Sequence, residues 1–221
     1  MGALIFDFDG VIADSEAIAN TVLAETVSDL GHPTTMDQSL TRYAGKRWAD
    51  VMAEIEKVTG KKLHAGFPED LKLATLERFR TDLREVSGAK AFIKRFSHLP
   101  RCIASSSSID RLELCLSLLA LEREFGSHVY SGDMVARGKP DPDIFLFAAD
   151  KLGVDPSDCL VIEDSAGGVR GAVAAGMTAI GLCAASHIRD GHGLKLREAG
   201  AVHLADSWAE VEDFAQGFFG D

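Results

Sequence analysis

Five short apolar segments alternate with helical patterns in the later part of the chain, and this alternation limits the fold more than any other feature. The apolar segments are residues 102–104, 128–130, 159–162, 178–182 and 201–204. Apolar side chains at helical spacing separate them, as in residues 144–152, where Gly153 ends the pattern. Strands that alternate with helices predict a parallel sheet that is covered by helices on both faces.

One further strand is expected near the N-terminus, where residues 4–6 form an apolar run that ends in carboxylates and a glycine. No strand-like run follows until about Ala89, and helical patterns occupy residues 18–30, 48–58 and 71–83. The first strand has no other sheet to join. We therefore expect an α/β fold with a Rossmann-like, doubly wound parallel sheet. Its core domain would comprise residues 1–13 and 86–221, with an all-helical cap domain of residues 14–85 inserted.

The composition argues against several functional classes. The chain has 221 residues, which fits one or two domains, and 46% of them are hydrophobic, which argues against disorder. A net charge of -11 at pH 7 disfavours binding to nucleic acids or to anionic membranes. No apolar run approaches the roughly 20 residues that span a bilayer, and the N-terminus lacks the basic region of a signal peptide.

The cysteines and histidines show no metal-ligand spacing. The residues concerned are Cys102, Cys115, Cys159, Cys183, His128, His187, His192 and His203. Isolated cysteines of this kind predict reduced thiols, mostly buried, in a cytoplasmic protein. The histidines are expected to be structural or solvent-facing. We expect a monomer or weak dimer.

Polar side chains follow three of the predicted strands, at the point where each strand ends. They are Asp7 and Asp9, then Ser105 and Ser106, then Glu163 and Asp164. Lys139 lies between the last two strands, in a Gly-Lys-Pro-Asp-Pro sequence. Because ligands of such sheets bind at the carboxyl ends of the strands, we expect these side chains to lie close together.

A cluster of carboxylates needs protons or a cation. Two unit negative charges about 4 Å apart repel by about 4 kcal/mol at an effective dielectric constant near 20. Oxygen ligands without histidine or cysteine favour a hard ion, so the expected cofactor is Mg²⁺. Taken singly, each feature has another interpretation: Asp7 and Asp9 as turn residues, Ser105 as a helix cap, and Lys139 as a surface lysine.

Together, the motifs resemble the haloacid dehalogenase superfamily of phosphotransferases, in the right order and over essentially the whole chain. They are Asp7-Phe8-Asp9-Gly10-Val11, the strand-end Ser105, Lys139-Pro140-Asp141-Pro142 and Glu163-Asp164-Ser165. Residues 7–16 and 138–143 are similar to the beta-phosphoglucomutase-like branch. The resemblance implies a helical cap inserted after the first strand, as expected above.

The resemblance also implies a reaction through an aspartyl-phosphate. Asp7 would be the nucleophile, and Asp9 would protonate the leaving alcohol and then activate water. Ser105, with Ser106 beside it, would bind the phosphoryl oxygens, and Lys139 would offset their charge.

The implied metal site holds Mg²⁺. Asp164 and Asp7 would bind the ion together with the backbone carbonyl group of Asp9. Glu163 would either bind the ion or lie directly behind its ligands.

A loop of the expected cap bears on the substrate. Phosphomutases of this branch carry a histidine and an arginine in the cap, and the matching residues here are Ala19 and Trp48, although a shift by one residue would restore Arg47. Both differences favour a phosphatase. Gly45, Lys46 and Arg47 would face the active site, where the two cations suggest a second anionic group on the substrate.

The leading hypothesis is a Mg²⁺-dependent phosphatase for a small phosphorylated sugar or sugar acid, similar to the 6-phosphogluconate phosphatase type. The alternative is a sugar phosphomutase of the beta-phosphoglucomutase type. A non-catalytic phosphoester-binding protein is a third hypothesis, and the intact set of catalytic residues argues against it.

Overall fold

The computed structural model describes residues 2–43, 46 and 48–220, which form two compact units. The first unit comprises Met1–Asp14 and Arg84–Asp221, and the second comprises Ser15–Leu83. Each unit has its own hydrophobic core.

The first unit contains a six-stranded parallel sheet. Its strands are β1 (Ala3–Phe6), β2 (Arg101–Ser105), β3 (Val129–Ser131), β4 (Cys159–Glu163), β5 (Thr178–Leu182) and β6 (His203–Ala205). They lie in the order β3-β2-β1-β4-β5-β6, and neighbouring strands are parallel. The predicted Rossmann-like α/β fold is therefore confirmed, and the N-terminal strand lies in the middle of the sheet.

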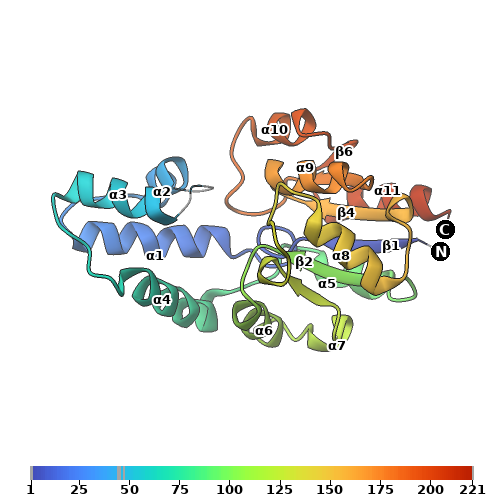
Figure 1. The fold of residues 1–221 in the computed structure, drawn as a ribbon, viewed down its shortest axis with the longest axis horizontal. Coiled ribbons are helices and arrows are strands. Elements are labelled where there is room, and N and C mark those ends of the chain that lie inside the picture. The colour runs from blue at the N-terminus through green and yellow to red at the C-terminus, as the bar shows by residue number, and fades with distance from the viewer. Residues whose placement is uncertain (1, 44–45, 47, 221) are drawn as a thin grey trace. The chain divides into compact units, whose positions relative to one another are not determined.

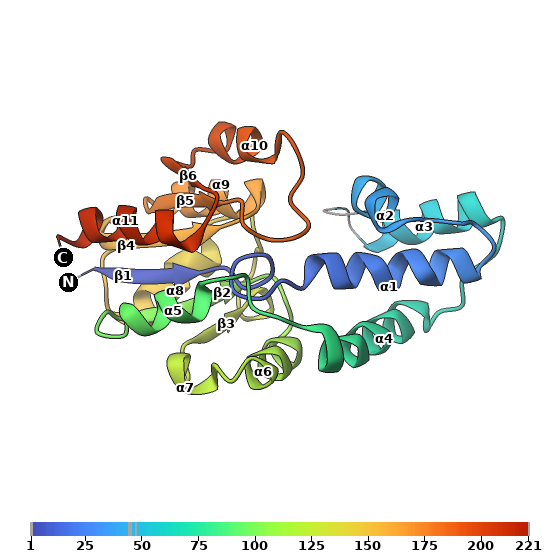
Figure 2. The same cartoon turned by 180° about the vertical axis from the view of Figure 1, so that it is seen from behind.

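In the part of this unit that the structure describes, seven α-helices follow or connect these strands. They are α5 (Ala89–Arg95), α6 (Ile109–Leu118), α7 (Glu122–Phe125), α8 (Asp143–Leu152), α9 (Ala166–Ala174), α10 (His192–Glu198) and α11 (Trp208–Phe219). Figure 1 shows α8 in front of the sheet, and Figure 2 shows α5 and α11 on the opposite face. Within the described residues, no helix has both the length and the apolar character needed to cross a membrane.

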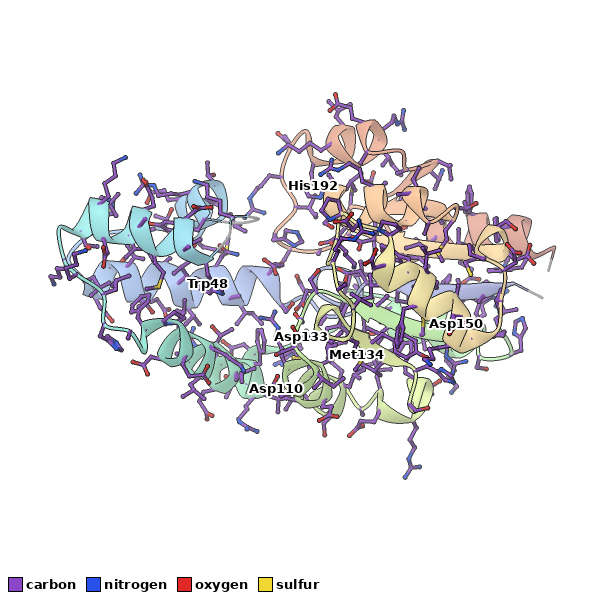
Figure 3. The ribbon with its side chains drawn as sticks, in the orientation of Figure 1. Trp48, Asp110, Asp133, Met134, Asp150 and His192 are labelled. Carbon is purple, nitrogen blue, oxygen red and sulfur yellow. The ribbon has the colours of Figure 1, made fainter. Side chains whose placement is uncertain are left out.

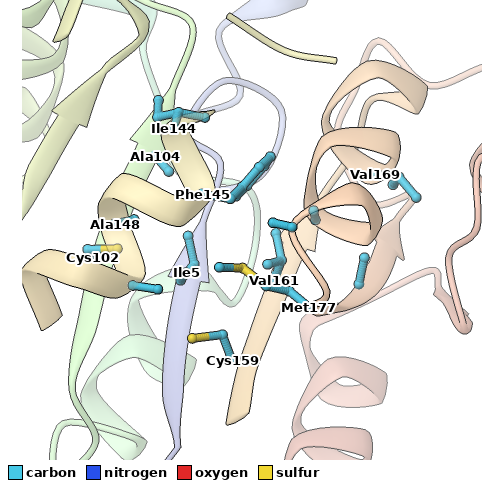
Figure 4. Close-up of a cluster of buried hydrophobic side chains, with 14 of the residues drawn as sticks. Ile5, Cys102, Ala104, Ile144, Phe145, Ala148, Cys159, Val161, Val169 and Met177 are labelled. Atoms are coloured by element: carbon cyan, nitrogen blue, oxygen red, sulfur yellow. The ribbon is translucent and has the colours of Figure 1, made fainter. Parts of the chain in front are cut away.

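Neighbouring side chains of β1 fill two different cores, because successive side chains of a strand point to opposite faces. Ile5 belongs to a cluster that includes Phe145 of α8 (Figure 4). The ring of Phe6 packs on the other face, with its centroid 6.1 Å from that of Phe92 in α5 and 6.0 Å from that of Trp208 in α11. Burial on both faces explains why β1 is a continuous apolar run.

The second unit is helical. Its elements are α1 (Glu16–Asp29), α2 (Met36–Tyr43), α3 (Trp48–Thr59) and α4 (Phe67–Asp82). Their apolar faces share a core that includes Val27, Ile55 and Leu71. The hydroxyl group of Ser39 in α2 donates a hydrogen bond of 2.9 Å to the side-chain oxygen of Asn20 in α1. A buried polar pair thus joins the two helices.

Among the differences from the sequence prediction, two have a clear physical reason. The last strand begins at His203 rather than at residue 201, because the amide of Ala201 bonds instead to the carbonyl group of Leu196 in α10. The helix α2 was not predicted, since it has few apolar side chains to mark a helical period.

Candidate active site

The carboxyl ends of the three central strands bring the predicted polar residues to one edge of the sheet. Phe6 at the end of β1 pairs with Ile103 of β2 on one side and with Ile162 of β4 on the other. Asp7 continues this register, since its amide donates to the carbonyl group of Ile162 at 3.0 Å. Each of the three strands therefore delivers polar residues to the same place.

Three carboxylates form a buried group at this edge. Each of Asp7, Glu163 and Asp164 offers an oxygen atom that lies within 4.8 Å of the other two. The residues are 8%, 0% and 5% exposed. Burial raises the pKa of Asp7 to about 7, and the negative charge of Glu163 adds to this rise, while Lys139 opposes it. The group thus favours a bound cation or a proton.

Lys139 is the positive partner of this group. Its ammonium Nζ lies 2.8 Å from Oδ1 of Asp7 and also bonds to Oε1 of Glu163. Burial alone would lower the pKa of Lys139, but the two carboxylates raise it above its ordinary value. Lys139 is therefore a charged, buried lysine, with only 7% of its side chain exposed, and the interpretation as a surface lysine is wrong.

Glu163 is held on both of its oxygens. Oε1 accepts from Lys139, and Oε2 accepts from the amide and hydroxyl groups of Ser165 at 3.1 and 2.9 Å. A Cβ atom on Gly168 would lie 1.7 Å from Oε1, so glycine is required where α9 approaches the carboxylate. These contacts hold the carboxylate of Glu163 in one position, from which it can fix the ammonium group of Lys139.

Asp164 is held by two histidines from α10 and the connection before it. Nε2 of His187 lies 3.3 Å from Oδ2 of Asp164. His192, at the start of α10 (Figure 3), donates from Nε2 to the backbone carbonyl oxygen of Asp164. A Cβ atom on Gly10, which has a φ of +79°, would lie 1.8 Å from Oδ2. Asp164 therefore has a closely fitted environment.

The donor chemistry of the three carboxylates fits Mg²⁺. The group offers oxygen atoms of three acidic side chains, and hard divalent cations prefer such ligands. Its net negative charge, which Lys139 reduces, is of the sign that a metal ion would neutralise.

Asp9 lies outside this group of three carboxylates, although its negative charge also contributes to the raised pKa of Asp7. Its oxygens bond to other residues: Oδ2 accepts from the hydroxyl group of Ser107, and Oδ1 accepts from Nη2 of Arg111 in α6, each at 2.5 Å. Neither Ser107 nor Arg111 belongs to the sequence motifs that predict the site. The position of Arg111 in the first turns of the helix after β2 is the only sequence signal for it.

The remaining predicted residues lie in three different settings. Ser105 ends β2 and is buried, with its hydroxyl oxygen accepting from the amide of Ser107 at 3.1 Å. Ser106 is exposed on the following loop. Lys46 is an exposed residue of the helical unit, whereas Gly45 and Arg47 lie outside the described residues.

For His187, which is expected from the sequence to be structural or solvent-facing, the contact with Asp164 favours the structural interpretation. Its side chain is 12% exposed and faces Asp164. The two histidine rings, of His187 and His192, lie 6.0 Å apart in an edge-on arrangement. The site as a whole places a buried carboxylate beside a fixed cation and beside further carboxylates, which is suited to reactions of anionic phosphate groups.

Comparison with known proteins agrees with this chemistry. A family profile described as haloacid dehalogenase-like hydrolase matches residues 1–176. The chain is 31% identical to the phosphorylated carbohydrates phosphatase of Thermotoga maritima, over 92% of this chain and 94% of that protein. It is 25% identical to the 6-phosphogluconate phosphatase of Escherichia coli, over 84% of each chain.

A solved structure shows the same fold. It is a HAD family hydrolase from Deinococcus radiodurans with bound phosphate and sodium, and it matches with a TM-score of 0.86 at 29% identity, covering 99% of this chain and 96% of that one. The matched profile spans well over half of the chain, including all of the strands that carry the acidic residues. This chain therefore belongs to the haloacid dehalogenase-like hydrolases and is an enzyme of that family.

Proposed function

We propose that this enzyme is a Mg²⁺-dependent phosphatase that hydrolyses a small phosphorylated sugar or sugar acid through an aspartyl-phosphate on Asp7. The observation that carries the proposal is the buried contact of 2.8 Å between Asp7 and Lys139 at the end of the central strand. A carboxylate in this position is a nucleophile whose negative charge, and that of an approaching phosphate, is offset by a fixed cation.

The reaction proceeds in two displacements at phosphorus. A carboxylate oxygen of Asp7 attacks the phosphoryl group, the bond to the substrate oxygen breaks, and the alcohol leaves. Water then attacks the aspartyl-phosphate, which releases inorganic phosphate and restores the carboxylate. Lys139 and Ser105 stabilise the phosphoryl oxygens in both steps.

Asp9 handles the protons of both displacements. In its acid form it protonates the departing alcohol oxygen, and it then takes a proton from the attacking water. An alcohol without such a proton donor is a poor leaving group, so this role matters most for sugar phosphates.

The proposed metal ligands are Asp7, Asp164 and the backbone carbonyl group of Asp9. Glu163 supports the site from behind, because both of its oxygens already accept hydrogen bonds from Lys139 and Ser165. When bound, Mg²⁺ supplies positive charge to the phosphoryl oxygens and helps to orient them for in-line attack.

The names of two relatives support the substrate class. One is a phosphatase of phosphorylated carbohydrates and the other a phosphatase of 6-phosphogluconate, which is a sugar acid. Lys46 belongs to the predicted substrate loop and is exposed. A Lys46→Ala variant that loses activity toward sugar acids, but keeps it toward neutral sugar phosphates, would support recognition of a second anion.

The test is phosphate release from a panel of phosphorylated sugars and sugar acids, with and without Mg²⁺. We expect release that requires Mg²⁺ and disappears in Asp7→Asn. Asp155→Asn is the matched control, because Asp155 is an exposed residue that caps a turn before β4. A radiolabelled phosphate that stays on acid-quenched protein and is released by hydroxylamine would identify the aspartyl-phosphate.

Two other outcomes would change the assignment. Interconversion of sugar phosphates that needs a bisphosphate primer, without net phosphate release, would indicate a phosphomutase. Binding of Mg²⁺ and of phosphate esters without any turnover would indicate a binding protein.

A further inference from the structure

Both carboxylate oxygens of Asp9 are held by the segment that follows β2. Ser107 donates from its hydroxyl group to Oδ2, and Arg111 donates from Nη2 to Oδ1. The side chains of Asp9 and Arg111 are 13% and 21% exposed, so the pair is largely shielded from water. Hydrogen bonds in such surroundings are stronger and restrict a side chain more than hydrogen bonds at the protein surface.

We propose that Arg111, together with Ser107, is a positioning residue that fixes the carboxyl group of Asp9 for proton transfer to the leaving oxygen. This inference rests on the proposed phosphatase function and on the role of Asp9 in it. Arg111 acts through Asp9 and needs no contact with the substrate.

The local backbone explains why Asp9 needs such support. Asp9 lies in a tight turn after β1, where the amides of Val11, Ile12 and Ala13 all donate to the carbonyl oxygen of Phe8. This turn fixes the backbone, but it leaves the side-chain torsions of Asp9 free. Two hydrogen bonds from outside the turn restrict them to one orientation, which general acid catalysis requires.

The partners of Asp9 are themselves held. The amide of Ser107 donates to the hydroxyl oxygen of Ser105 at 3.1 Å, and the carbonyl group of Ser107 accepts from the hydroxyl group of Ser131 at 2.8 Å. Arg111 is anchored in α6. The ends of β2 and β3 thereby determine where Ser107 meets Asp9.

A positioning role makes a different kinetic prediction from phosphate binding by Arg111. A sugar alcohol must be protonated as it leaves, whereas p-nitrophenolate leaves readily without a proton. Loss of the oriented acid should therefore affect kcat/KM for a sugar phosphate strongly and for p-nitrophenyl phosphate weakly. A residue that binds the phosphoryl group, or one that only stabilises the fold, would affect both substrates equally.

The experiment compares kcat/KM for the best sugar phosphate and for p-nitrophenyl phosphate in Arg111→Gln, Arg111→Lys and Ser107→Ala. For Arg111→Gln we expect about a 100-fold loss with the sugar phosphate, the lower end of what a general acid contributes, and only a few-fold loss with p-nitrophenyl phosphate. Arg111→Lys should restore part of the kcat/KM value for the sugar phosphate that Arg111→Gln loses. Ser107→Ala should change the ratio in the same direction by less.

Arg101→Gln is the matched control. Arg101 begins β2 at the opposite end of the strand, and its guanidinium group bonds to Glu124 at 2.8 Å with 12% of the side chain exposed. Loss of this partly buried ion pair should leave the ratio of the two kcat/KM values unchanged.

Three results separate the conclusions. Equal losses with both substrates in Arg111→Gln and Ser107→Ala would overturn the positioning role while leaving the phosphatase intact. If Arg111→Gln does not fold, the ratio of the two kcat/KM values in Ser107→Ala tests the positioning role by itself. A wild-type protein that releases phosphate from neither ester would instead overturn the proposed function itself.

Discussion

Nζ of Lys139 lies 2.8 Å from Oδ1 of Asp7, and both side chains are almost completely buried. The same ammonium group also bonds to Glu163. One lysine from the connection between β3 and α8 therefore offsets two carboxylates from β1 and β4. This arrangement ties the charge balance of the site to a single residue.

Removing Lys139 should destabilise the metal-free protein. In Lys139→Met the free energy of unfolding should fall by about 3 kcal/mol, the lower end of the cost of breaking a buried ion pair, because Asp7, whose pKa is already raised by burial, can take up a proton. Phosphate release should also be lost. Thermal unfolding with and without Mg²⁺ measures the first effect, and Mg²⁺ should stabilise the variant more than the wild type.

The control for this variant is Lys151→Met. Lys151 is an exposed lysine at the end of α8 whose ammonium group lies over the ring of Phe147. The Lys151→Met substitution should change the unfolding temperature little. A Lys139→Met protein as stable as this control would show that Lys139 is not required to stabilise the buried acidic residues in the folded protein.

The glycine at residue 10 should be essential for the site. In Gly10→Ala the new methyl group would overlap Oδ2 of Asp164, which lies 1.8 Å from the ideal Cβ position. We expect Asp164 to move, with weaker Mg²⁺ binding in calorimetry and about a 100-fold loss of turnover, as for a misplacement of about 1 Å.

Gly176→Ala separates this effect from backbone strain. Gly176 has the same φ of +79°, and no atom lies within 4 Å of its ideal Cβ position. It should lower stability by about 1–2 kcal/mol, the cost of a left-handed alanine, with full Mg²⁺ affinity. Equal Mg²⁺ affinity in the two variants would refute the proposed overlap.

The sequence predicted the sheet and its acidic edge because these depend on local patterns. Asp7, Ser105 and Glu163 each end or follow an apolar run, and parallel strands place their carboxyl ends together. Lys139 is different. No periodicity places a loop residue against β1, so only its motif indicated that Lys139 joins Asp7.

The partners of Asp9 could not be predicted in the same way. Arg111 lies in a helix whose apolar period explains Leu112 and Cys115, and an arginine directly before Leu112 is usually interpreted as a surface residue. Its contact depends on the rotation of α6 relative to the turn after β1. That rotation is set by packing and is not visible in the pattern of α6 alone.

The start of the helix α2 is marked in the sequence by a motif that does not depend on apolar periodicity. The amide of Thr35 donates to the side chain of Gln38, and the amide of Gln38 donates to the hydroxyl oxygen of Thr35. This reciprocal pair is a capping box, which marks a helix start even where apolar residues are few.

The thiols should react slowly in the native protein. Burial raises the pKa of Cys102 well above its ordinary value, that of Cys115 to about 12 and that of Cys159 to about 11. Since the thiolate is the reactive form, a raised pKa lowers its fraction at pH 8, and the reaction rate should rise with pH up to the pKa. Ellman's reagent should therefore detect the half-buried Cys183 first.

Unfolding in guanidinium provides the control for this measurement. All four cysteines are free thiols, so all four should react at once in the unfolded protein. Rapid reaction of Cys102 in native protein at pH 8 would contradict its burial.

His187 should strengthen metal binding through Asp164. The imidazole Nε2 lies 3.3 Å from Oδ2 of Asp164 and helps to hold the carboxylate in one orientation. Loss of a residue that orients a metal ligand lowers metal affinity by about 10- to 100-fold, and we expect the lower figure for His187→Ala because His192 still holds the backbone of Asp164. Calorimetric titration of the metal-free protein with Mg²⁺ measures the change directly. His128→Ala is the matched control, because His128 bonds to the hydroxyl group of Tyr130 at 2.8 Å, next to β3. Equal Mg²⁺ affinity in both histidine variants would mean that Gly10 and the backbone alone orient Asp164.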